Sequence, residues 1–234
     1  MLSAASPVDI VAVLWFVGAW TAYSLVINHF ADSGRSLSSA MDRQRRRWMR
    51  TMARRDLRMI DTGIMGGLQN GTAFFASTSL IAIGGGFALL NATDHVYDVL
   101  RDLSLSPSSP RGLFEVKAVG LILIFGFAFF EFGWAYRLFN YASILVGATP
   151  SAAHAGEAEA IAAADRAGSF TIAAGRHFNH GLRAFFFAVG YLGWFVNGYV
   201  LIVTTTAILL VQLYRQFLSP SARLVIEAAR QPEI

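Results

Sequence analysis

A row of polar side chains introduces the last apolar region of the chain. Its members recur at helical spacing: Arg176, Asn179, His180 and Arg183. Positions i, i+3, i+4 and i+7 share one face of an α-helix, so these side chains form one stripe. Facing Arg137 and Asn140, the stripe would form a cationic pocket for an anion or a lipid headgroup, because guanidinium groups suit phosphate and carboxylate. In the alternative interpretation, these residues cap the helix start and bond to the preceding connection.

A second set of polar residues lies inside otherwise apolar segments: Asn70, Ser77, Thr78, Glu131 and Asn197. Polar groups at membrane depth normally face a bundle interior, a partner or a cavity. Asn70, Ser77, Gly84 and Asn91 recur every seventh residue and therefore lie along one stripe of a helix. The stripe predicts either the lining of a pore or pocket, or a close helix–helix contact made by small residues.

Glu131 is the charged residue placed deepest in its apolar segment. Arg137 follows six residues later, about 240° away around a helix, so the two side chains do not pair within it. Each needs a partner elsewhere. For Arg137 the alternatives are a side chain that reaches the interface and a ligand for a headgroup or anion.

Signals for catalysis or for a metal centre are weak. His177 and His180 are three residues apart and could share a metal ion, as could His95, Asp98 and Asp102 in a helical segment. Neither set has a ligand signature such as HExxH, and no GxSxG motif occurs. The absence of cysteine excludes thiolate chemistry. We predict no catalytic residues, no metal centre and no cofactor apart from bound phospholipid.

The elements that would position these residues are membrane helices. The chain has 234 residues, 55% of them hydrophobic and 15% charged, and a mean hydropathy of +0.48. This composition argues against a water-soluble domain. Four apolar segments have about the 20 residues that a helix needs to span a bilayer, at 8–27, 68–90, 113–140 and 182–211. We therefore expect an all-α membrane protein, with residues 1–234 forming a single four-helix transmembrane domain.

Arginines gather on one side of these spans, in the two connections at 33–66 and 150–181. The first holds nine, and the second holds Arg166 and Arg176, with Arg137 and Arg183 flanking it. Both connections are predicted to be amphipathic helices, with Asp42 and Arg46 as an i, i+4 pair in the first. Loops rich in arginine stay in the cytoplasm, so both termini are expected outside it. With no organellar signal evident, the bacterial inner membrane is the simplest location.

Three blocks of the sequence are distinctive in combination: FFASTSLIAIGGGFALL, YRLFNYASILVGA and FNHGLRAFFFAVGYLGWF. With them the chain resembles an uncharacterised family of multi-pass membrane proteins, found in bacteria and plants and known only as a domain of unknown function. The resemblance spans the chain from about Asp56 to Trp194 and implies a membrane fold. It implies no activity, substrate or catalytic residue.

Two functions are compatible with this pattern. In the first, a homo-oligomer conducts or binds small ions or solutes, and its arginine-rich cytoplasmic mouth favours anions. In the second, the chain is a non-catalytic accessory or assembly subunit of a larger membrane complex. The expected partners are membrane lipids, especially anionic ones, and either further copies of the chain or a larger complex. An enzyme that acts on lipid is a third, less favoured interpretation. Binding of nucleic acid is not predicted.

Overall fold

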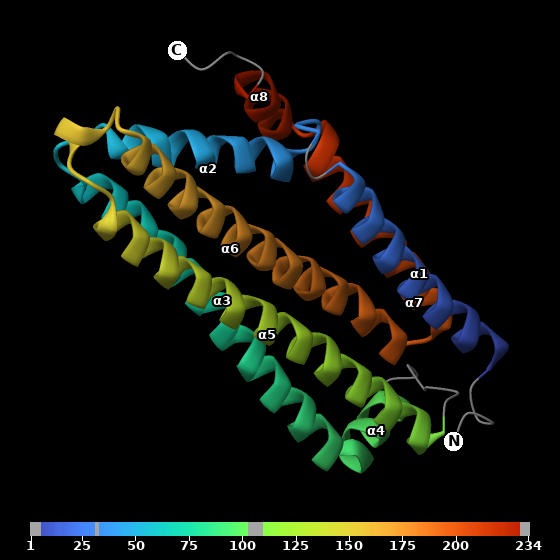
Figure 1. The fold of residues 1–234 in the computed structure, drawn as a ribbon. Helices are drawn as coiled ribbons and strands as arrows, with labels where there is room; N and C mark the ends of the chain where they lie inside the picture. Colours follow the sequence, from blue (N-terminus) through green and yellow to red (C-terminus); the bar gives the residue numbers. More distant parts are fainter. Residues whose placement is uncertain (1–5, 31–32, 103–109, 230–234) are drawn as a thin grey trace. The chain divides into compact units, whose positions relative to one another are not determined.

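The computed structural model describes residues 6–30, 33–102 and 110–229, which are helical apart from short turns and include no strand (Figure 1). The α-helices are α1 (Pro7–His29), α2 (Leu37–Ala53), α3 (Met59–Asn91), α4 (Thr93–Asp102), α5 (Arg111–Ala148), α6 (Ala158–Tyr191), α7 (Gly198–Leu213) and α8 (Pro220–Ala228). A π-helical turn at Tyr214–Leu218 joins α7 to α8. The predicted all-α class is confirmed for the described residues.

Four helical segments are long and apolar enough to cross a membrane: Pro7–His29, Met59–Asn91, Arg111–Ala148 and Gly198–Ala228. The number agrees with the prediction, and the first three contain the predicted spans 8–27, 68–90 and 113–140. Helices α3 and α5 are longer than predicted, with 33 and 38 residues. At 1.5 Å per residue they extend about 50 and 57 Å, well beyond the ~30 Å of a hydrocarbon core.

The fourth predicted span, 182–211, is not one continuous helix. Helix α6 ends at Tyr191, a 3₁₀ turn follows at Leu192–Phe195, and α7 begins at Gly198. The side chain of Asn197 caps α7 by accepting a hydrogen bond from the backbone N–H of Val200 at 2.9 Å. The second predicted connection, 150–181, likewise continues into α6. The fourth apolar segment is therefore Gly198–Ala228.

Close contacts between small residues explain why the chain turns back after α6. The hydroxyl of Thr204 donates to the carbonyl oxygen of Gly190 at 2.7 Å. A Cβ added at Gly193 would lie 2.5 Å from the Thr204 Oγ1 atom, and one at Gly190 would lie 3.3 Å from Ile208. The end of α6 and the beginning of α7 therefore form an antiparallel helical hairpin, which larger residues at these glycines would push apart.

The chain divides into two compact units, and each is described separately. Unit 1 comprises Met1–Asn28, Ser77–Phe129 and Leu182–Tyr214. Aromatic rings hold α1 to α6 within it: the ring centroid of Phe16 lies 5.8 Å from that of Phe187 and 5.2 Å from that of Tyr191. Trp20 stacks on Phe187 at 5.4 Å. Such aromatic pairs add to the free energy of apolar burial.

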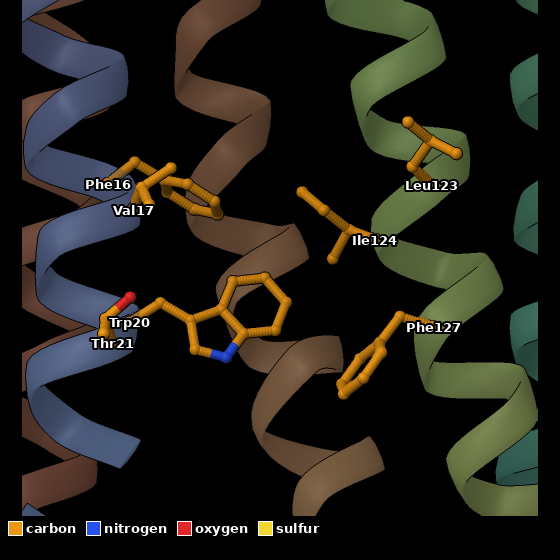
Figure 2. Close-up of a pocket in the computed structure, with 7 residues that line it drawn as sticks. All are labelled: Phe16, Val17, Trp20, Thr21, Leu123, Ile124 and Phe127. Atoms are coloured by element: carbon orange, nitrogen blue, oxygen red, sulfur yellow. The ribbon is translucent and has the colours of Figure 1, made fainter. Parts of the chain in front are cut away.

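Unit 1 also contains an apolar groove between α1 and α5, with a volume of about 450 Å³ (Figure 2). Helix α1 contributes Phe16, Val17, Trp20 and Thr21, and α5 contributes Leu123, Ile124 and Phe127. Almost all of the lining is hydrocarbon, so the groove suits an apolar chain and offers little to a charged solute.

Unit 2 comprises His29–Ala76, Phe130–Gly181 and Arg215–Ile234. Buried apolar residues from α2, α3, α5 and α6 form its core: Met49, Met52, Met65, Leu138, Phe139, Ala142, Val146, Ala167 and Ala174. Small residues on α6 allow α2 to pack closely, since a Cβ at Gly168 would lie 3.7 Å from the Met49 side chain.

Buried polar contacts fix the corner between α2 and α3 in unit 2. The carboxylate of Asp61 accepts hydrogen bonds from the Trp48 indole N–H at 2.6 Å and from the Arg55 guanidinium at 2.7 Å. The Asp61 side chain is fully buried. Nearby, Arg58 donates to the carbonyl oxygens of Val146, Thr149 and Pro150. Val146 lies in the last turn of α5, and Thr149 and Pro150 directly follow it, where the carbonyls of a helix lack internal partners.

Candidate functional site

A carboxylate and two imidazoles converge in unit 2. Glu131 projects from α5, whereas His177 and His180 project from neighbouring turns of α6. The Glu131 Oε2 atom lies 2.9 Å from His177 Nδ1 and 3.5 Å from His180 Nδ1. The partner that the sequence required for Glu131 is therefore this pair of histidines. One ligand atom from each of the three residues lies within 4.8 Å of the other two.

The surroundings of this Glu–His–His cluster are aromatic on the side of α3. The Phe132 ring stacks on Phe75 at 5.5 Å and packs against Phe178 at 5.6 Å. Gly181 permits this packing, because a Cβ at that position would lie 2.8 Å from the Phe132 ring. Because residue 181 has no side chain, α5 and α6 can pack closely at the position that directly follows His180.

The cluster remains open to its surroundings. The exposed fraction of the side chain is 16% for Glu131, 35% for His177 and 37% for His180. The Trp134 ring lies edge-on to His177, with 6.4 Å between the centroids. All three side chains therefore lie partly exposed at the surface of the helical core.

The predicted anion ligands on α5 have other partners. Arg137 donates to the Tyr141 hydroxyl at 2.7 Å, and its guanidinium lies 5.9 Å from the Trp134 ring centroid. The carbonyl oxygen of Asn140 accepts from the Gln69 side chain at 2.8 Å. Asn140 thus joins α5 to α3, while Arg137 stays with aromatic residues of its own helix.

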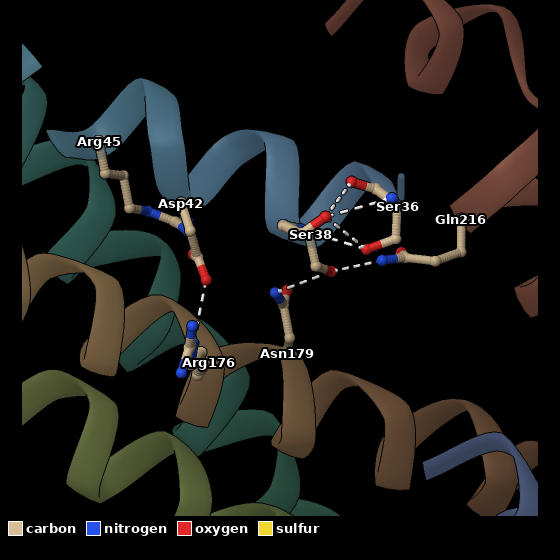
Figure 3. Close-up of polar contacts among 8 residues, drawn as sticks. Ser36, Ser38, Asp42, Arg45, Arg176, Asn179 and Gln216 are labelled. Atoms are coloured by element: carbon tan, nitrogen blue, oxygen red, sulfur yellow. Dashed lines mark hydrogen bonds and ion pairs between the residues drawn. The ribbon is translucent and has the colours of Figure 1, made fainter. Parts of the chain in front are cut away.

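The members of the predicted stripe on α6 have different partners, and Figure 3 shows those of Arg176 and Asn179. Arg176 donates to Asp42 of α2 at 3.0 Å, and Asp42 also accepts from Arg45 at 3.0 Å. The Ser38 hydroxyl lies 3.5 Å from Asn179 Nδ2 and 2.7 Å from Gln216 Nε2. Arg176 and Asn179 therefore bond to α2, which lies in the first predicted connection, 33–66, and not in the one that precedes their own helix. Of this stripe, His180 belongs to the cluster in unit 2.

Arg183, the last member of the predicted stripe, belongs to unit 1. It is buried, donates to the Ser24 hydroxyl at 2.8 Å and lies 4.9 Å from the Tyr23 ring centroid. A hydroxyl and the negative face of an aromatic ring both contact this cation. Arg183 therefore fastens α6 to α1.

The predicted lining residues occupy varied places. Asn70 and Ser77 are exposed on α3, as are Gly84 and Asn91 of the same stripe, and Thr78 is partly exposed. Asn197 is exposed and caps α7. Glu131 is the member of this set that joins the Glu–His–His cluster.

His95 and His154 do not lie in a cluster of three possible metal ligands of the kind that Glu131, His177 and His180 form, among the described residues. In the part of the chain that the structure describes, no group of three ligating side chains includes His95, Asp98 or Asp102. His154 pairs with Glu157 at 2.7 Å, and both side chains are exposed. This pair has one imidazole and one carboxylate but no third ligand, which makes it a natural control for the cluster.

The His154–Glu157 pair gives a pH-dependent prediction. The hydrogen bond that the His154 imidazole donates to the Glu157 carboxylate holds the pKa of His154 above its ordinary value of 6.5. Because the pKa is raised in the folded protein, the pair stabilises it at low pH and loses this contribution as the pH rises through the folded pKa. We expect an NMR titration of His154 to show a midpoint above 6.5 that Glu157→Gln lowers. An unchanged midpoint in this variant would contradict the assigned contact.

The fold and the cluster together define a class: an all-helical protein whose four long apolar helices are compatible with a multi-pass membrane protein, with ionisable side chains on two helices. The chain belongs to a family of proteins of unknown function, DUF599, whose model matches residues 11–221. This confirms the resemblance inferred from the three sequence blocks. No curated protein and no solved structure matches the chain. The activity must therefore be inferred from the site itself.

Proposed function

We propose that this protein is an ion-handling membrane protein in which the Glu131–His177–His180 cluster binds the transported ion. The observation that carries the proposal is a carboxylate on the long apolar helix α5. It lies 2.9 and 3.5 Å from two imidazoles of α6. Ionisable residues are costly in membrane helices and commonly mark ion pathways or proton relays. Carboxylate and imidazole groups can both accept and release protons near neutral pH when their surroundings adjust their affinity.

The ion that we propose is a cation, although the sequence favours anions. Asp42 engages Arg176, and Arg137 reaches Tyr141, so these guanidinium groups already have partners. Arg183 is likewise satisfied by Ser24. In contrast, the cluster presents a carboxylate and two nitrogen atoms with lone pairs in their neutral form, which attract protons or metal ions.

A homo-oligomer remains part of the proposal. A single copy has few helices with which to enclose a wide path. The exposed positions Asn70, Ser77 and Gly84 on α3 offer a surface of small and polar residues, of the kind through which membrane helices associate. An accessory subunit would use the same surface for a foreign helix. Native mass spectrometry after gentle extraction distinguishes a closed assembly of one chain from a complex with a second protein.

The same extraction tests two further parts of the proposal. We propose that phospholipid remains bound, and the apolar groove between α1 and α5 supports this because its lining suits an acyl chain. We also propose the bacterial inner membrane as the location, with the arginine-rich connections toward the cytoplasm. Lipid that co-purifies with the chain tests the first part, and the membrane fraction of the bacterial host in which the chain is found tests the second.

Ion flux through reconstituted protein tests the proposed function directly. We expect liposomes that contain the purified chain to take up a cation, either protons or a divalent metal ion, faster than empty liposomes when a potassium diffusion potential drives the flux. Internal dyes for pH and for divalent metal report the uptake. Glu131→Gln should lower the rate to near that of empty liposomes, because it removes the charge at the centre of the cluster. Glu115→Gln is the matched control on α5, since Glu115 pairs with Arg111 outside the cluster.

Two results would reject this function. One is a rate for the wild-type chain equal to that of empty liposomes, with protons and with monovalent and divalent cations alike. The other is equal flux through the Glu131→Gln and Glu115→Gln variants, which would mean that the ion does not depend on the cluster.

A further inference from the structure

We propose that Glu131, His177 and His180 form a binding site for one divalent transition-metal ion. The inference rests on the proposed function, because it names the class of ion for the same cluster. It also differs from the sequence interpretation, in which no metal centre is predicted and the two histidines lack a third ligand.

The types of ligand define the class of ion. Imidazole nitrogen suits zinc, iron, nickel and copper, and a carboxylate oxygen completes such sites in many proteins. Calcium and magnesium prefer sites made of oxygen ligands, which this cluster does not provide. Two nitrogen ligands and one oxygen ligand therefore favour a transition metal over the alkaline-earth ions.

The distances fit ligands that share one ion. Bonds of about 2.0–2.1 Å place two ligand atoms about 2.9 Å apart at a right angle, and about 3.3 Å apart at a tetrahedral angle. The Glu131 Oε2 atom lies 2.9 Å from His177 Nδ1 and 3.5 Å from His180 Nδ1. All three ligand atoms lie within 4.8 Å of one another. Small rotations of the side chains would therefore bring all three to one metal ion.

The backbone already places the ligands for such a site. His177 and His180 are three residues apart on a continuous α-helix, so their side chains leave the same face. Glu131 comes from α5, which Phe132 and Gly181 hold close to α6. Ligands on two packed helices form a more rigid site than ligands on loops.

The number of protein ligands also indicates what the site does. Structural zinc sites usually have four protein ligands, whereas three leave coordination positions free for water or another small ligand. The partial exposure of all three side chains agrees with such an open position. An ion held in this way can be exchanged, which is what an ion-handling protein requires.

Cobalt provides a spectroscopic probe of this site. We expect the full-length chain, purified with a tag that contains no histidine and treated with a chelator, to bind about one Co²⁺ ion per chain, with visible absorption typical of nitrogen and oxygen ligands. Zn²⁺ should displace it. Each of His177→Ala, His180→Ala and Glu131→Gln should lower the affinity at least about tenfold.

The chain offers a matched control. His154→Ala removes an exposed imidazole that also contacts a carboxylate, at 2.7 Å, but belongs to no group of three ligands. This variant should bind Co²⁺ as the wild-type chain does. If one of the other substitutions prevents folding, Glu131→Asp is the alternative variant. It keeps the carboxylate charge but moves the ligand oxygen away from the histidines, so it should weaken Co²⁺ binding without abolishing it.

An intrinsic reporter complements the absorption measurement. Trp134 lies 6.4 Å from His177, so a paramagnetic ion in the cluster should quench its fluorescence. The quenching should disappear in Trp134→Phe, although four other tryptophans remain among the five of the chain. Quenching that persists in this variant would place the ion elsewhere.

The outcomes separate this inference from the proposed function. Two results overturn the metal site but leave a proton-handling cluster. In the first, flux depends on Glu131 but the chain binds no Co²⁺. In the second, flux depends on Glu131 but the His177→Ala and His154→Ala variants bind Co²⁺ equally. Binding of Co²⁺ that depends on all three ligands without any ion flux supports the metal site and overturns transport.

Discussion

Replacing Asp42 by alanine is expected to be strongly destabilising, by about 3–5 kcal/mol, because it breaks a buried ion pair and leaves a cation without its partner. Only 11% of the Asp42 side chain and 15% of the Arg45 side chain are exposed. Burial lowers the pKa of Arg45, and the neighbouring Asp42 partly offsets this effect. The loss is measured as a lower melting temperature in detergent, followed by fluorescence-detected size exclusion.

A double variant tests the cause of this effect. Removing Arg45 together with Asp42, as Asp42→Ala with Arg45→Met, eliminates the buried cation and should restore part of the lost stability. Arg176 is more exposed and can reach solvent without Asp42. A double variant that is no more stable than Asp42→Ala would show that the cost comes from lost packing and not from an uncompensated charge.

Replacing Asp61 by alanine should cost about 3 kcal/mol, because two hydrogen bonds to a buried carboxylate disappear together. The Trp48 indole N–H loses its acceptor, and Arg55 loses its ion-pair partner. The cost is moderated because the second oxygen of Asp61 is buried without a hydrogen-bond partner among the described residues. The same melting measurement applies.

The neighbouring Asp56 provides the control for this substitution, since its side chain is exposed. Asp56→Ala should change the melting temperature by little. Equal losses for Asp56→Ala and Asp61→Ala would indicate a general effect of charge in the α2–α3 corner, and would refute the role given to the buried contacts of Asp61.

The apolar helices could be predicted from the sequence, whereas the break in the last predicted span could not. Long uncharged segments such as the one in α3 identify a membrane helix by hydropathy and length alone. The reversal after α6 depends instead on how Gly190 and Gly193 meet Thr204. Such a contact between distant residues does not change local hydropathy. Hydropathy therefore predicts one span, 182–211, where the structure has the end of α6 and the separate helix α7.

The candidate site was predictable in parts but not as a whole. The sequence showed that Glu131 needs a partner, and separately that His177 and His180 share a face. Their meeting depends on the packing of α5 against α6, which helical periodicity cannot provide. In α2, Asp42 pairs with Arg45 at i, i+3, which helical spacing also allows, and not with Arg46 at i, i+4. Its second partner, the distant Arg176, depends on packing between helices.

The reversal between α6 and α7 bears on the topology of the chain. Each crossing of a bilayer reverses the side on which all later residues lie, and four crossings return the chain to the side where it began. Helix α6 has 34 residues and is about 51 Å long, but its polar residues exclude it from a count based on hydropathy. With α6 counted as well, the number of crossings becomes odd. Residues 6 and 229 therefore lie on the same side of the membrane if α6 remains outside the bilayer. They lie on opposite sides if α6 crosses it.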